Sequence, residues 1–96
     1  MVAGSPFRGK IRYFRPSLKS GLAVIDIPQK VAAGLGGLKQ MRVRGKLNGM
    51  EFSSNTMPAG GGVLALSLSQ KLLSAAGLQV GDEIEVVELQ RIDASP

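Results

Sequence analysis

A repeated pattern of strand, short helix and strand most constrains how this chain of 96 residues can fold. Residues 21–47 and 62–89 each contain an apolar run, a Gln-Lys pair and a short helix-like piece that ends at glycine. One such unit cannot bury its apolar face alone, so two units are expected to pack against each other. The alternative interpretation is a chance likeness between two small apolar segments.

The two copies align with one change of offset. An offset of 41 residues places Leu66 on Ile25, and after the helix an offset of 43 places Val86 on Val43. The inward positions of the aligned strands are apolar in both copies, as two halves of one core require. The alignment therefore predicts a duplicated half-barrel with pseudo-twofold symmetry.

Local patterns predict six strands and two short helices. Apolar and polar residues alternate along several segments, which is typical of half-buried strands. The segment 57–62 contains Pro58 and three glycines and is predicted to be a flexible loop. Short strands with tight turns favour a small barrel or a sandwich. The predicted strands are residues 7–14, 22–27, 41–47, 50–53, 63–68 and 83–89, and the predicted helices are residues 29–33 and 70–76.

Short motifs predict one hairpin and the end of one helix. Asn48-Gly49 lies between alternating runs and predicts a two-residue type I′ turn, which places Lys46 opposite Glu51. Gly77 follows the second predicted helix and suits a left-handed C-terminal cap.

The predicted core uses the inward side of each strand together with one residue from each helix. Its members are Ile11, Tyr13, Ala23, Ile25, Ile27, Val31, Met41, Val43, Leu47, Phe52, Leu64, Leu66, Leu68, Leu72, Ile84 and Val86. One β domain is expected over residues 7–91, between a flexible N-terminus at 1–6 and a tail at 92–96.

The composition restricts the available chemistry. The chain has neither cysteine nor histidine, which excludes disulfides, thiolate metal sites and imidazole proton transfer. An enzyme would have to use carboxylates, Lys, Tyr or Ser, so a non-catalytic role is favoured and no metal or cofactor is predicted. No apolar run approaches the length of a membrane span, about 18 residues, and the first residues lack the features of a signal peptide. A cytoplasmic protein is expected.

A series of motifs in one order resembles a known bacterial family, domain of unknown function 1905. The motifs are Val43 to Phe52 with its Asn-Gly turn, Met57 to Gly62, Ala75 to Leu78 and Val80 to Ile84, and the resemblance covers about residues 7–90. It implies a closed, double-split β-barrel similar in shape to AbrB-type DNA-binding domains, and no established activity. Val63-Leu64 stands where members of the family often carry a basic residue or histidine.

A basic surface is the first candidate site. Residues 1–50 hold ten Lys/Arg and one acid, whereas residues 51–96 hold two Lys/Arg and six acids. If the first and third predicted strands are neighbours, their cations share one surface that can bind phosphates. These cations are Arg8, Lys10, Arg12, Arg15, Arg42, Arg44 and Lys46. Weak, one-sided binding of nucleic acid or another anion is one hypothesis, and an ordinary solvated strand face is its alternative.

Symmetric recognition of duplex DNA is not expected. AbrB-type proteins use equivalent basic residues from both halves of the barrel. Here the alignment places Glu85 on Arg42 and Val87 on Arg44, so the second copy lacks the matching charges.

A ligand pocket and an assembly surface are the other candidates. Tyr13, Asp26, Lys30 and Glu51, together with Arg15, are predicted to gather near one barrel end and hold a small anion or support catalysis. The alternative is that Asp26 forms a structural ion pair with an arginine. The basic and acidic copies can also pair head to tail, so both a monomer and a homodimer remain open. The sequence therefore favours a non-catalytic binding module with a one-sided basic face.

Overall fold

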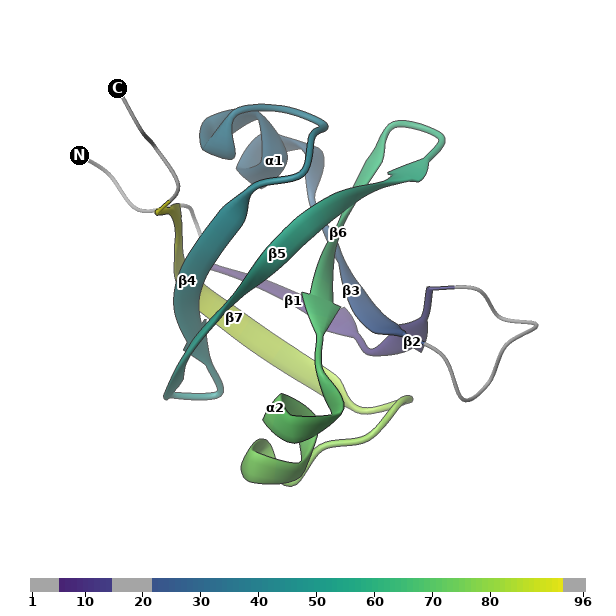
Figure 1. Ribbon diagram of the computed structural model, residues 1–96, viewed down its shortest axis with the longest axis vertical. Coiled ribbons are helices and arrows are strands. Elements are labelled where there is room, and N and C mark those ends of the chain that lie inside the picture. The colour runs from purple at the N-terminus through teal and green to yellow at the C-terminus, as the bar shows by residue number, and fades with distance from the viewer. Residues whose placement is uncertain (1–5, 15–21, 93–96) are drawn as a thin grey trace.

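The strands of this protein form one antiparallel sheet that curls into a nearly closed barrel (Figure 1). The computed structural model describes residues 6–14 and 22–92. Within them the strand order is β1-β7-β4-β5-β6-β3-β2. The elements are β1 (Phe7–Lys10), β2 (Arg12–Tyr13), β3 (Ala23–Ile27), α1 (Gln29–Leu35), β4 (Arg42–Leu47), β5 (Met50–Gly60), β6 (Val63–Leu68), α2 (Gln70–Ala76) and β7 (Glu83–Arg91). The predicted class, a mostly β barrel with two short helices, is confirmed.

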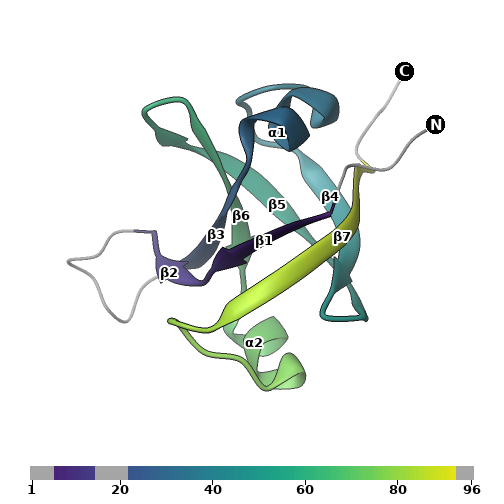
Figure 2. The same cartoon turned by 180° about the vertical axis from the view of Figure 1, so that it is seen from behind.

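The barrel closes because β1 and β2 are consecutive in the chain but pair with opposite edges of the sheet. β1 pairs with β7, and β2 pairs with β3. Figure 2 shows β1 lying between β7 and β3. The prediction of six strands is wrong because the segment 7–14 divides at Ile11. The Ile11 N–H donates to the Asp82 carbonyl, and the Ile11 carbonyl accepts from the Gly81 N–H, which removes Ile11 from both ladders.

β5 is longer than predicted because it also changes partner. It pairs with β4 up to Asn55 and with β6 from Thr56 onward. The Thr56 N–H donates to the Met41 carbonyl, on the side away from β6. Alternate residues of a strand face the same side, so the nitrogen of Pro58 also faces away from β6, and its missing N–H costs no ladder bond. The predicted loop at 57–62 is therefore strand up to Gly60, and only Gly61 and Gly62 turn the chain.

The predicted hairpin and helix cap are confirmed. Asn48 and Gly49 have φ of 50° and 87°, as a type I′ turn requires. Gly77 has φ 68° and ψ 35°, and the Leu78 N–H donates to the Leu73 carbonyl, which completes a Schellman motif. The first helix, by contrast, extends beyond the predicted residues 29–33 and ends at Leu35.

The core lies inside the barrel, and the two helices cover opposite ends of it (Figure 1). Fourteen of the sixteen predicted core residues are buried; Tyr13 and Leu72 are only partly buried. In α2 the buried residue is Leu73, whereas Leu72 packs against the core and is only partly buried. Apart from Gly45, the buried residues that the prediction missed are Phe7, Val24, Ala32, Leu35, Thr56, Ala65, Leu73 and Leu89.

The strand pairing follows the relation that a twofold axis would impose on the two copies. Ile25 and Leu66, which the offset of 41 makes equivalent, lie directly opposite each other where β3 meets β6. The Ile11–Asp82 hydrogen bond also has a counterpart in the bond from Thr56 to Met41. The offset therefore stays at 41 after the helix, and the predicted change to 43 is wrong.

The same twofold relation explains the position of the two N-terminal strands in the barrel. β1 and β2 occupy, beside β7 and β3, the position that β5 occupies beside β4 and β6. Phe7 opposite Val86 thus corresponds to Phe52 opposite Gly45, and both phenylalanines are buried. The last strand of the second copy comes from the start of the chain.

Candidate anion-binding site

The basic strands β1 and β4 are not neighbours, because β7 lies between them. β7 carries acids that lie directly opposite the cations of β1: Glu85 faces Arg8, and Glu83 faces Lys10. The predicted continuous surface of seven cations therefore has an acidic strand through its middle. Arg15, which was part of that prediction, lies outside the described residues.

The cations of β4 have different neighbours from those of β1. Arg44 lies opposite Ser53 of β5, and Arg42 lies opposite Asn55. With the offset of 41, the equivalent residues of the second copy are Glu85 and Glu83, which face the cations of β1. At these equivalent positions the cross-strand pairs are of opposite charge in one half of the barrel, whereas in the other half an arginine faces a neutral side chain.

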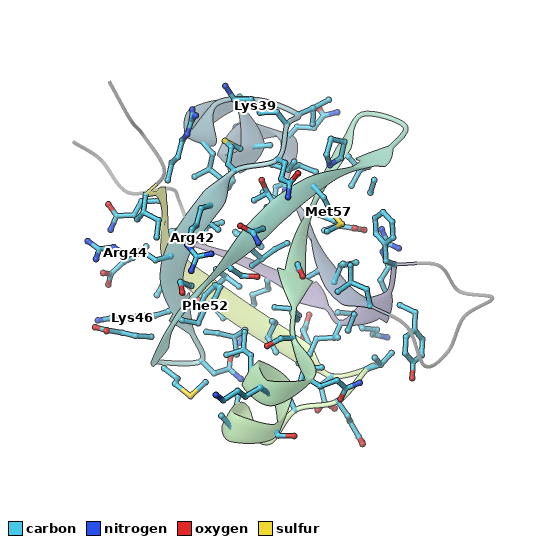
Figure 3. All side chains as sticks on the ribbon, in the orientation of Figure 1. Lys39, Arg42, Arg44, Lys46, Phe52 and Met57 are labelled. Carbon is cyan, nitrogen blue, oxygen red and sulfur yellow. The ribbon has the colours of Figure 1, made fainter. Side chains whose placement is uncertain are left out.

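A concavity of about 470 Å³ lies on the outer side of the sheet, over β4, β5 and β7. We call it the β4 basin. Arg44, Gly45 and Lys46 line it from β4, and the other two strands contribute polar side chains at both ends. Figure 3 shows Arg44 and Lys46 leaving β4 toward the outside of the barrel. The remaining lining residues are Glu51, Phe52, Ser53, Glu88 and Gln90.

A β-bulge in β7 shapes this basin. Arg44 lies opposite Gln90 and Lys46 opposite Val87, so Glu88 and Leu89 together face the single residue between them on β4. Glu88 has φ 55°, a left-handed conformation that is uncommon for a residue other than glycine. The bulge allows the side chain of Leu89 to be buried while Glu88 is exposed at the basin.

The Glu88 carboxylate lies 3.8 Å from the Lys46 ammonium. Lys46 also lies opposite Glu51, as the hairpin predicted. The expected cross-strand neighbour is thus confirmed, but the ion pair that the structure records for Lys46 is with Glu88.

Gly45 makes the bulge possible. A Cβ atom on Gly45 would lie 2.9 Å from the Val87 carbonyl oxygen and 3.1 Å from the Leu89 Cα. Only glycine permits so close an approach of two backbones. The sequence contains a signal for this feature, since the inward residues of β7 are Ile84, Val86 and then Leu89, which breaks the period of two.

The second predicted site is not assembled at one barrel end. Tyr13 pairs with Ala23 at the start of β3, whereas Lys30 lies in α1 beyond the end of β3. Glu51 is beside the β4–β5 turn and is the only one of the four predicted residues that lines the β4 basin.

Asp26 forms an ion pair with Arg12 instead. The Arg12 Nη2 and Nε atoms donate to the Asp26 Oδ1 at 2.7 Å and 3.1 Å. The structure therefore agrees with the alternative that the sequence left open, in which Asp26 forms a structural ion pair with an arginine.

We expect Asp26→Asn to change the free energy of unfolding by less than about 1 kcal/mol. The Arg12 and Asp26 side chains are 38% and 52% exposed, so water and salt screen most of their attraction. Urea denaturation at low and high salt measures the effect. A loss above about 2 kcal/mol would contradict a surface ion pair of this kind.

A family model described as Domain of unknown function (DUF1905) matches residues 7–87. The chain belongs to the DUF1905 family. The matched part of this DUF1905 domain begins at β1 and ends within β7. No curated protein matches the chain.

In the described residues no helix is long and apolar enough to cross a membrane. Within residues 6–14 and 22–92, no group of three or more acidic side chains can hold a metal ion.

Proposed function

We propose that this DUF1905 domain is a non-catalytic binding module that holds an anionic group in the β4 basin, with Arg44 as the main contact. The observation that carries the proposal is the contrast between the two halves of the barrel. Arg44 lies between two neutral side chains, Ser53 and Gln90, whereas the equivalent Glu85 lies opposite Arg8. No carboxylate lies directly opposite Arg44 on either β5 or β7. A bound anion would therefore supply the negative charge that Arg8 receives from Glu85 in the other half of the barrel.

The chemistry of these side chains suits a carboxylate or a phosphate. A guanidinium group presents a planar fork of N–H donors that matches two oxygens of such an anion. The Ser53 hydroxyl and the Gln90 amide can each donate a further hydrogen bond. Arg44 is exposed, so binding is expected to be weak and to weaken further with salt.

The surroundings favour a small anion over an extended nucleic acid. The carboxylates of β7 separate the β4 cations from those of β1, which shortens the basic surface. Phe52 is the aromatic residue of the basin and is buried, so it does not offer a face for stacking with bases. The pairing of basic and acidic strands within one chain also weakens the hypothesis of head-to-tail assembly.

We expect Arg44→Gln to weaken the binding of valerate and of inorganic phosphate about tenfold. Chemical-shift titration at an ionic strength of about 20 mM gives the apparent Kd, because screening is weak there. The matched control is Arg8→Gln, which removes an arginine on the other side of β7 and should leave the Kd unchanged. Equal weakening by both variants would show general charge attraction and overturn the proposed site.

A further inference from the structure

The β4 basin carries opposite net charges at its two ends. One row across the three strands is Gln90, Arg44 and Ser53, with a single positive charge. In the next row Lys46 is flanked by two carboxylates, Glu51 directly opposite and Glu88 at 3.8 Å, so this row has a net negative charge. Arg44 and Lys46 are two residues apart on one strand, which separates the rows by about 7 Å.

From this arrangement we infer that the ligand of the β4 basin is a small zwitterion, with its carboxylate at Arg44 and its ammonium group at the Glu51 and Glu88 end of the basin. The inference rests on the proposed anion-binding function and specifies the ligand class. A pure anion would gain the contact with Arg44 but would bring the rest of its surface toward the two carboxylates. Lys46 offsets only one of the two carboxylates, so a ligand that carries an amine at its other end can pair with the remaining negative charge.

The separation of the rows sets the length of the ligand. An extended ω-amino acid of five carbons places its two charges about 6 Å apart, close to the spacing of the rows. The volume of the concavity, about 470 Å³, lies within the range of sites for small molecules. The Glu88 carboxylate is presented to this ligand by the bulge.

Three probes of equal carbon number test the inference: 5-aminovalerate, valerate and pentylamine. Chemical-shift titrations of the whole chain at low salt should give about fivefold tighter binding of 5-aminovalerate than of valerate. The variant Glu51→Gln with Glu88→Gln should remove this difference while the protein still binds valerate. Glu85→Gln, on β7 but outside the basin, is the matched control and should keep the difference.

The outcomes separate this inference from the proposed function. If valerate binds as tightly as 5-aminovalerate at the Arg44 row, the zwitterion inference fails and the anion-binding function stands. If neither 5-aminovalerate nor valerate binds, or if pentylamine is the only probe that binds, both the zwitterion inference and the anion-binding function fail. A preference for 5-aminovalerate that remains in the Glu51→Gln and Glu88→Gln double variant would also overturn the inference, because the ammonium group would then bind elsewhere.

Discussion

Replacing Gly45 with alanine is expected to lower the free energy of unfolding by about 2–4 kcal/mol. The added Cβ would lie 2.9 Å from the Val87 carbonyl oxygen and 3.1 Å from the Leu89 Cα. Both are backbone atoms, so no change of side-chain rotamer can relieve the contact. β4 and β7 would have to separate at the bulge, and the buried Leu89 side chain would lose its packing. Urea denaturation followed by circular dichroism measures the loss.

The matched control for this change is Gly34→Ala. Gly34 lies in α1, its φ is not in the left-handed region, and a Cβ there would meet no atom within 4 Å. Alanine is favoured over glycine in a helix by about 1 kcal/mol, so this variant should be as stable as the natural chain or more stable. If Gly45→Ala were as stable as Gly34→Ala, the close approach of β4 and β7 would be refuted.

The variant Thr56→Val should lower the free energy of unfolding by about 2–3 kcal/mol. The Thr56 side chain is fully buried at the point where β5 changes partner. Its hydroxyl donates to the Lys39 carbonyl at 2.9 Å and accepts from the Met41 N–H at 3.0 Å. Valine keeps the shape but leaves the buried Met41 N–H without its acceptor, and such a group carries the full penalty of desolvation.

Thr56→Ser separates the hydroxyl from the methyl group. Serine keeps both hydrogen bonds and loses one buried methyl, which is worth about 0.8 kcal/mol. Serine should therefore be more stable than valine at this position in thermal or urea denaturation. If valine were the more stable variant, packing rather than the two hydrogen bonds would determine stability at the point where β5 changes partner.

Features that depend on a few adjacent residues could be predicted from the sequence. The Asn48-Gly49 turn and the Gly77 cap depend on local φ preferences, which neighbouring residues determine. The repeat indicated a barrel and correctly placed Ile25 equivalent to Leu66. The inward positions of the strands also followed from alternation, since a face that is buried must be apolar.

Features that depend on which strands meet could not be predicted in the same way. Pro58 and the glycines after it favour a loop, but the nitrogen of Pro58 faces an unpaired side that only the fold defines. The division of the first strand at Ile11 depends on its contact with Gly81 and Asp82, far away in the sequence. The bulge at Glu88 was not predicted, although the three-residue spacing between the inward residues Val86 and Leu89 is a signal for it.

The candidate site was predicted only in part. Arg44 and Lys46 were correctly assigned to one outer face of a strand, and both line the β4 basin. The partners of these cations depend on the order of the strands. The sequence grouped Arg8 with them only on the condition that the first and third strands are neighbours, and it missed Gln90 and Ser53. Charge composition alone could not show that β7 would lie between the two basic strands.

The most direct measurement of the central claim is a map of backbone amide shifts of the whole chain during titration with valerate. The account predicts that the amides of Gly45, Ser53 and Gln90 shift together and saturate with one Kd, and that in Arg44→Gln these shifts need about tenfold more valerate. Shifts centred instead on Arg8 of β1, or unchanged in Arg44→Gln, would contradict an anion-binding site in the β4 basin.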